Sequence, residues 1–196
     1  MTPALSLDEP GDLTGFPTVE PPARLVRVCR ADQHTWWFSS DGSGRFDLFP
    51  PEGTCYLATD NYAAIREATR LGPVSTTWVR ARELRAVAPF DPHARLAATT
   101  RKAAGSYGMT TELATVVPYE LPRRWAAAFR NHGLDGIRHQ LRHDQRARPS
   151  GVALFGTAGT PPLPDGERSP LTAPAVEAAG IAVHSPPPTA SLTIVP

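Results

Sequence analysis

The chain has 196 residues, of which 41% are hydrophobic, and its formal net charge is +1. This length allows one domain with a real core and is short for two. So small a charge gives no long-range field for nucleic acid or anionic lipid, so any anion must be held by local arginines. No apolar run approaches the roughly 18 residues of a membrane span, and the N-terminus lacks the features of a signal peptide. We therefore expect a cytoplasmic protein with no membrane partner and no direct nucleic-acid binding.

The two cysteines, Cys29 and Cys55, both lie in short apolar runs that are typical of strands. No CxxC pair is present, and the two histidines of HQLRH lack the glutamate of a zinc-binding HExxH motif. We expect both thiols to be buried and reduced, as is usual in a reducing cytosol. We expect no metal site and no prosthetic group.

The two ends of the chain are rich in proline. Residues 1–22 have few apolar residues in any periodic order, which predicts a loose arm or an extended wrapper. One domain should then cover 23–196, with a Pro-rich C-terminal extension from about residue 160. Within that extension, APAVEAAG is typical of a short helix, and GIAVH and LTIV of closing strands.

The first half of the domain shows strand and helix signals in clear order. RLVRVCR, from Arg24, predicts a strand, and the following segment, with Gly42 and Gly44, predicts an irregular loop. A compact strand is expected at Thr54–Ala58. A helix over Tyr62–Arg70 should follow, capped by Asp60 or Asn61 and stopped by Gly72.

The second half predicts further short strands with helices inserted between them. Strands are expected at STTWVRA, LRAVAPF, GIRHQLRH and RPSGVALFG; helices are expected from Asp91 to about Arg101, over Thr110–Val116 and over Tyr119–Asn131. Strands and helices do not alternate regularly, which indicates an α+β domain. No GxGxxG follows a strand, so a dinucleotide-binding fingerprint of the doubly wound type is absent.

Arg45, Tyr56 and Glu67 are spaced evenly, at positions 45, 56 and 67. They come from three successive elements: a turn, a strand and a helix. A guanidinium, a phenol and a carboxylate offered in this way can surround one small anionic molecule. A nucleotide that carries a diphosphate would need such a pocket.

Several segments around these residues resemble the RES family, which is named for Arg, Glu and Ser. The matching segments are RVCR, WWFSSDGSGRFDLF, GTCYLA, AAIREA, ELPRRWAAAFRNHGLDGIRHQLRHD and GVALFG, which together cover most of residues 24–156. The resemblance implies an ADP-ribosyltransferase-like fold and NAD as substrate, in several members with inorganic phosphate as co-substrate. It also implies that the protein is the toxin of a pair whose partner is a small DNA-binding antitoxin.

On this resemblance, the candidate catalytic residues are Arg45, Tyr56 and Glu67, and the candidate substrate-binding residues are Arg27, Ser39 and Ser150. Cleavage of the nicotinamide–ribose bond develops positive charge on the ribose, which Glu67 would stabilise. Arg27 and Arg45 would hold the diphosphate or an incoming phosphate. Tyr56 would lie against the nicotinamide ring or position the ribose.

The sequence departs from the family at the serine. In the stretch GIRHQLRH, His139 stands at an aromatic position and Leu141 where the serine is expected; Ser150 is the nearest substitute. A leucine cannot donate a hydrogen bond. Three functions therefore stay open: cleavage of NAD with phosphate or water as acceptor, transfer of ADP-ribose to a macromolecule, and a catalytically degenerate interaction module. The arginine-rich run from 138 to 148 is interpreted as a solvated loop.

Overall fold

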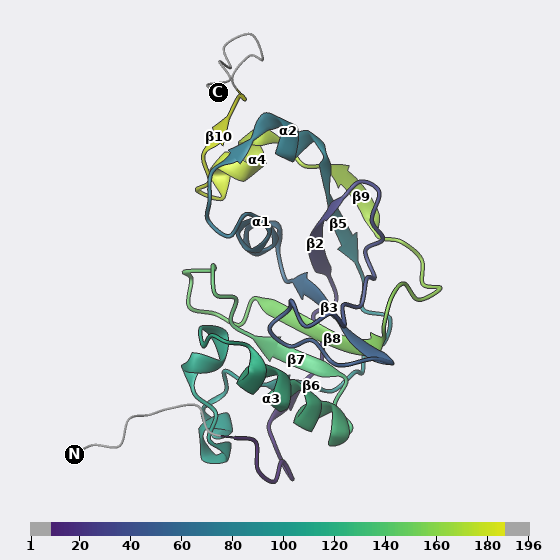
Figure 1. The fold of residues 1–196 in the computed structure, drawn as a ribbon, viewed down its shortest axis with the longest axis vertical. Helices are drawn as coiled ribbons and strands as arrows, with labels where there is room; N and C mark the ends of the chain where they lie inside the picture. Colours follow the sequence, from purple (N-terminus) through teal and green to yellow (C-terminus); the bar gives the residue numbers. More distant parts are fainter. Residues whose placement is uncertain (1–8, 187–196) are drawn as a thin grey trace, which may run out of the picture.

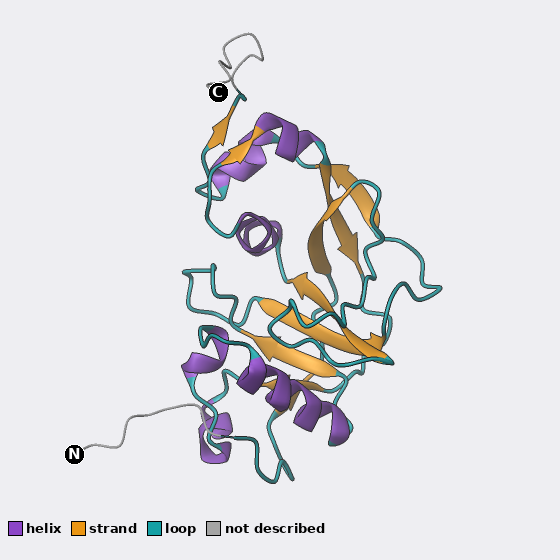
Figure 2. Ribbon diagram, in the orientation of Figure 1, coloured by secondary structure: helices purple, strands orange, loops and turns teal. Residues whose placement is uncertain are grey.

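The structure is a computed structural model that describes residues 9–186. Its centre is an eight-stranded sheet of order β1-β6-β7-β8-β3-β2-β5-β9 (Figures 1 and 2). Its strands are β1 (Thr18–Val19), β2 (Leu25–Arg30), β3 (Glu52–Ala58), β5 (Arg82–Val87), β6 (Leu96–Ala98), β7 (Gly136–His139), β8 (Gly151–Thr157) and β9 (Glu167–Pro170). β4 (Val74–Ser75) and β10 (Val183–His184) form a separate parallel pair.

The helices form three groups along the sheet (Figure 1). They are α1 (Asn61–Thr69), α2 (Thr76–Arg80), the 3-10 helices η1 (Lys102–Tyr107) and η2 (Thr111–Ala114), α3 (Glu120–Asn131) and α4 (Ala173–Ala178). α3 and the short 3-10 helices lie at one end of the sheet, α1 beside its middle, and α2 with α4 at the other end. α3 packs against β7, and α1 packs against β2 and β3. α2 and α4 lie beyond α1, near the β4–β10 pair, so the sheet carries separate helical layers at its two ends.

The core between α3 and the sheet includes part of the N-terminal segment. Trp125 and Phe129 of α3 are completely buried there together with Ile137. Leu13 and Phe16 are buried in the same cluster, and β1 pairs with β6. The described part of the Pro-rich N-terminal segment is thus folded along the sheet.

The sheet divides between β2 and β3. β2 is paired along its whole length with β5, and β3 along its whole length with β8. β2 and β3, by contrast, share the single register pair Val26↔Ala58. Beyond that pair the two strands diverge, and a wedge opens between two halves that are each well hydrogen-bonded. This wedge positions the candidate site.

Two predictions of secondary structure are wrong. STTWVRA was expected to be a strand, yet α2 begins there because the Ser75 side chain accepts a hydrogen bond from Trp78 N at 3.1 Å and caps a helix. The helix expected from Asp91 is instead a turn followed by β6. The Asp91 carboxylate accepts from His93 N at 2.8 Å and so favours a turn, and Leu96–Ala98 is buried between β1 and β7.

Two further predicted elements are shorter than expected. The helix expected over Thr110–Val116 is a single 3-10 turn, η2. The strand expected over GIRHQLRH ends at His139, so Leu141 lies beyond it. The LTIV segment lies outside the described residues.

The predicted elements around the wedge are confirmed. β2, β3, α3 and β8 lie where the sequence indicates, as does α1, whose cap Asp60 accepts from Ala63 N at 2.9 Å. Cys29 and Cys55 are buried free thiols. Within residues 9–186, every helix is too short or too polar to cross a membrane.

Candidate active site

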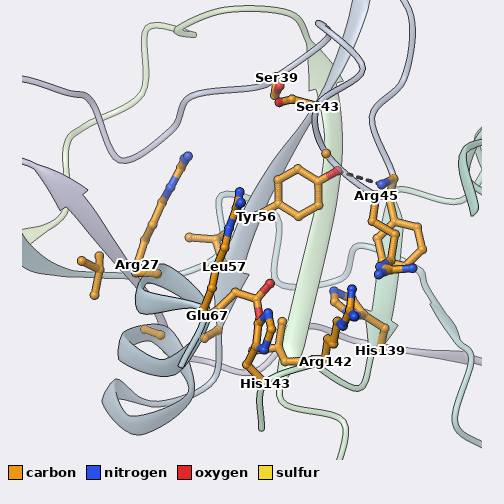
Figure 3. A pocket seen from close by; sticks show the side chains of 18 of the residues that line it. Arg27, Ser39, Ser43, Arg45, Tyr56, Leu57, Glu67, His139, Arg142 and His143 are labelled. Carbon is orange, nitrogen blue, oxygen red and sulfur yellow. Dashed lines mark hydrogen bonds between the residues drawn. The ribbon is translucent and has the colours of Figure 1, made fainter. Parts of the chain in front are cut away.

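A cavity of about 710 Å³ opens where β2 and β3 diverge (Figure 3). Its walls come from β2, β3, the loop 39–46, α1 and the segment 139–143. Five of the six predicted site residues line it: Arg27, Ser39, Arg45, Tyr56 and Glu67. The structure thus brings together side chains from elements that are distant in the sequence, including the evenly spaced Arg45, Tyr56 and Glu67.

Arg27 spans the wedge from β2. Its Nη1 donates to Thr35 O at 2.8 Å and to Trp37 O at 3.2 Å, and lies 3.5 Å from Cys55 Sγ on β3. These contacts fix the side chain in place. Because a guanidinium has five N–H donors, the remaining ones are left for a ligand.

Arg45 connects the loop 39–46 to the segment after η2. Its Nη1 donates to Val116 O at 2.7 Å and to Leu113 O at 3.3 Å, and its guanidinium lies 4.5 Å from the centre of the Tyr119 ring. Burial lowers the pKa of Arg45. The Nη1 donors of Arg45 thus hold the cavity wall, and its other N–H donors are left for the cavity.

Tyr56 fixes the loop that carries Arg45. Its hydroxyl accepts from Phe46 N at 2.8 Å and donates to Asp47 Oδ1 at 2.8 Å (Figure 3 shows the bond to Phe46). A Cβ at Gly44 would collide with that hydroxyl and with the Asp47 carboxylate, so the close approach requires glycine. Burial, together with Asp47, raises the pKa of Tyr56 well above its usual range. The neutral hydroxyl therefore holds the loop, and the ring faces the cavity.

Glu67 projects from α1 toward Arg142 and His143 (Figure 3). The side chain is open to solvent inside the cavity, yet protein surrounds most of the carboxyl group, and this burial raises its pKa. The charges of Arg45, Arg70 and Arg142 and a hydrogen bond from the backbone of His143 act in the opposite direction. A carboxylate held among cations in this way is suited to stabilising positive charge on a bound molecule.

The sequence analysis did not place Arg142 and His143 in the site. Both line the cavity beside Glu67, in the run interpreted as a solvated loop. Arg142 is exposed, and within the described residues it makes no hydrogen bond or ion pair. Burial and neighbouring arginines lower the pKa of His143. Neither residue carried a local signal, because their position depends on tertiary contacts.

Those tertiary contacts attach the loop 140–150 to α1. Arg66 Nε donates to His143 O at 2.7 Å. Arg146 binds the Asp144 carboxylate through two bonds of 2.8 and 2.7 Å, and its Nη2 lies 3.1 Å from Asp60 Oδ1. Arg148 also binds Asp60. The cap of α1 is therefore also the anchor of the loop that faces Glu67.

His139 and Leu141 close the cavity where the family serine was expected. The buried His139 ring packs edge-on against Phe46, with Nδ1 3.0 Å from Gln140 O. Burial lowers its pKa to about 4, so the ring is neutral at pH 7. Leu141 is buried in the cluster that includes Ile65 of α1. An apolar side chain thus occupies the position at which the serine was expected.

The serine candidates differ in position. Ser150 is completely buried and does not line the cavity, and its Oγ has no hydrogen-bond partner among the described residues. Ser39 does line the cavity, and its Oγ lies 3.0 Å from Asp47 Oδ2 and 3.2 Å from Asp41 Oδ1. Of the two, only Ser39 is placed to contact a molecule in the cavity.

Comparison with known proteins shows a likeness to a solved structure. No protein-family model matches the chain, and no curated protein matches it. Among solved structures, it is similar to a chain in the crystal structure of the M. tuberculosis MbcT–MbcA toxin–antitoxin complex. The TM-score is 0.63 at 16% sequence identity, over 85% of this chain and 93% of that chain. The likeness concerns the fold, and it is consistent with the predicted class of a compact α+β domain.

Proposed function

We propose that the protein consumes NAD by cleaving its nicotinamide–ribose bond. The observation that carries the proposal is that Arg27, Arg45 and Glu67 line one cavity, with Tyr56 between them. Its volume, about 710 Å³, lies within the range of roughly 300–1,000 Å³ that small-molecule sites span. Two cations suit the diphosphate of NAD, and one carboxylate suits the ribose at the reacting end.

Each residue then has a role set by its contacts. Arg27, Arg45 and the unpaired Arg142 bind the diphosphate by charge-assisted hydrogen bonds. The C–N bond to nicotinamide breaks, its electron pair leaves with nicotinamide, and positive charge develops on the ribose. Glu67 stabilises that charge. The new bond to the ribose forms from phosphate or water, which loses a proton.

We also propose that the protein is the toxin of a toxin–antitoxin pair, with a small DNA-binding antitoxin as partner. The shared fold with a chain from a toxin–antitoxin complex supports this role. Expression of the wild type should arrest growth, and Glu67→Gln at equal abundance should not. Normal growth with active wild-type protein would refute the toxin role and leave the chemistry standing.

Leu141 favours a second candidate, a binding module without catalysis, because it supplies no hydroxyl beside Glu67. Calorimetry with NAD separates the two candidates, since an interaction module gives no heat of NAD binding. Transfer of ADP-ribose to a macromolecule is the other alternative. With labelled NAD, transfer would leave label on protein or nucleic acid, whereas our proposal predicts small labelled products.

The test is nicotinamide release by the purified protein, with and without inorganic phosphate. Release that accelerates with phosphate and yields a phosphorylated ADP-ribose identifies phosphorolysis; release independent of phosphate identifies hydrolysis. If wild-type protein releases no nicotinamide under either condition, the proposed activity is wrong.

A further inference from the structure

A second cavity, of about 300 Å³, lies beside the β1–β6–β7 end of the sheet. Its polar lining consists of Glu20, Thr100, Arg101 and Arg138. Successive side chains of a strand point to opposite faces. The Arg138 side chain therefore leaves β7 on the face opposite to Ile137, which packs in the α3 core, and to His139, which lines the first cavity.

Arg138 is the unusual residue of this cavity. It is half-buried, and its Nη1 is buried without a hydrogen-bond partner among the described residues. Burial, followed by the charge of Arg148, lowers its pKa. A buried N–H donor without an acceptor is costly in free energy. The Nη1 atom of Arg138 therefore calls for a hydrogen-bond acceptor that reaches it inside the cavity.

The nearby carboxylates are already engaged. Asp60, the acid whose charge acts on Arg138, accepts from Ala63 N and pairs with both Arg146 and Arg148. The other acid, Glu20, is largely exposed, and its Oε1 lies 3.2 Å from His93 Nδ1. Neither forms a salt bridge with Arg138.

We propose that this second cavity binds a small phosphate-bearing anion. Arg138 supplies the buried donors, and Arg101 and the Thr100 hydroxyl act from the rim. A guanidinium matches the oxygen geometry of a phosphate through paired hydrogen bonds. The volume is at the lower end of that known for ligand sites, which favours a single phosphate group over a dinucleotide.

Residue-resolved NMR tests this site separately from the first cavity. Inorganic phosphate is titrated into full-length protein at constant ionic strength, with chloride as the control anion. We expect saturable shifts of the Thr100, Arg101 and Arg138 amides in the wild type and in Glu67→Gln. The same titration with AMP shows whether the second cavity binds free phosphate or a phosphate monoester. Saturable shifts with either ligand support the proposal.

Arg138→Met and the exposed Arg95→Met form the matched pair of variants. Arg138→Met should weaken phosphate binding at these amides at least tenfold, whereas Arg95→Met should not change it. Because Arg138→Met removes a half-buried cation whose Nη1 has no acceptor among the described residues, it should also unfold at the same temperature as wild type, or higher, without phosphate. The proposal fails if neither ligand gives saturable shifts at these amides, or if Arg138→Met binds phosphate as the wild type does.

Discussion

Two ionic networks hold opposite walls of the large cavity, and they differ in burial. Behind Arg27, the completely buried Arg85 binds Asp165 at 2.8 Å, and Asp165 accepts from the Thr35 backbone, whose carbonyl in turn holds Arg27. Behind Arg142, Arg146 pairs with the buried Asp144, but the pairs that hold the loop to α1, Arg146–Asp60 and Arg148–Asp60, are exposed on both sides, by about a third to a half. Solvent and salt screen exposed pairs far more than buried ones. The first wall is therefore a rigid scaffold, and the second is adjustable.

The largest effect should come from breaking the buried network. Arg85→Met removes the buried cation that pairs with Asp165 and Glu83, and it takes the Arg85 donors away from the backbone carbonyls of loop 31–33. Removing one partner of a buried pair costs about 3–5 kcal/mol, and we expect that loss in the free energy of unfolding. Denaturant titration measures it, with the exposed Arg80→Met as control. A loss below about 1 kcal/mol would show that the first wall does not depend on this network.

The next effect concerns the loop that carries Arg45. Tyr56→Phe removes the hydroxyl bonded to Phe46 N and Asp47, and leaving these groups unsatisfied should cost about 1–3 kcal/mol. Tyr62→Phe is the matched control, because Tyr62 contacts two arginines through its ring. Equal losses of stability in the two variants would contradict the role given to the Tyr56 hydroxyl.

On the adjustable wall, Arg142→Ala should raise the KM for NAD about tenfold with little change in kcat, since it removes about 1.4 kcal/mol of ligand binding. Arg142→Lys should restore part of the affinity, and Arg95→Ala should have no effect. Steady-state nicotinamide release gives both constants. An unchanged KM in Arg142→Ala would exclude this arginine from the binding site.

A smaller effect should follow from detaching the loop itself. Asp60→Asn keeps a side chain that caps α1 equally well, yet it removes the charge that pairs with Arg146 and Arg148. Surface pairs contribute about 0–1 kcal/mol each, so we expect at most about 1 kcal/mol lost in stability and a KM raised about twofold. Added salt should raise the KM more in the wild type than in Asp60→Asn. An identical salt response would contradict the anchoring role.

The smallest effect is a gain in stability. Because burial raises the pKa of Glu67 in the folded state, this residue favours folding when protonated, and that contribution is lost as the pH rises through its folded pKa. Glu67→Gln does not titrate, so it should melt at a higher temperature than wild type at pH 7, and the difference should shrink toward pH 4. A lower melting temperature at pH 7 would contradict this electrostatic account.

The sequence was informative where local signals and the fold agree. The Asp60 cap and the strand runs of β2 and β3 sufficed to predict the elements around the wedge. The strand propensity of Thr76 and Thr77 led to a wrong prediction, because the Ser75 cap favours a helix at these residues. The place of Arg142 in the site could not be predicted, because it depends on ion pairs between residues as far apart as Asp60 and Arg146. No local pattern encodes such contacts.

The most direct test of the central claim compares wild type and Glu67→Gln in two measurements on the same preparations, NAD binding by calorimetry and nicotinamide release. If one cavity holds NAD between its arginines and this carboxylate, both proteins should bind NAD. The variant should release nicotinamide at least about a hundredfold more slowly. Equal rates of release, or no heat of NAD binding in either protein, would contradict the account.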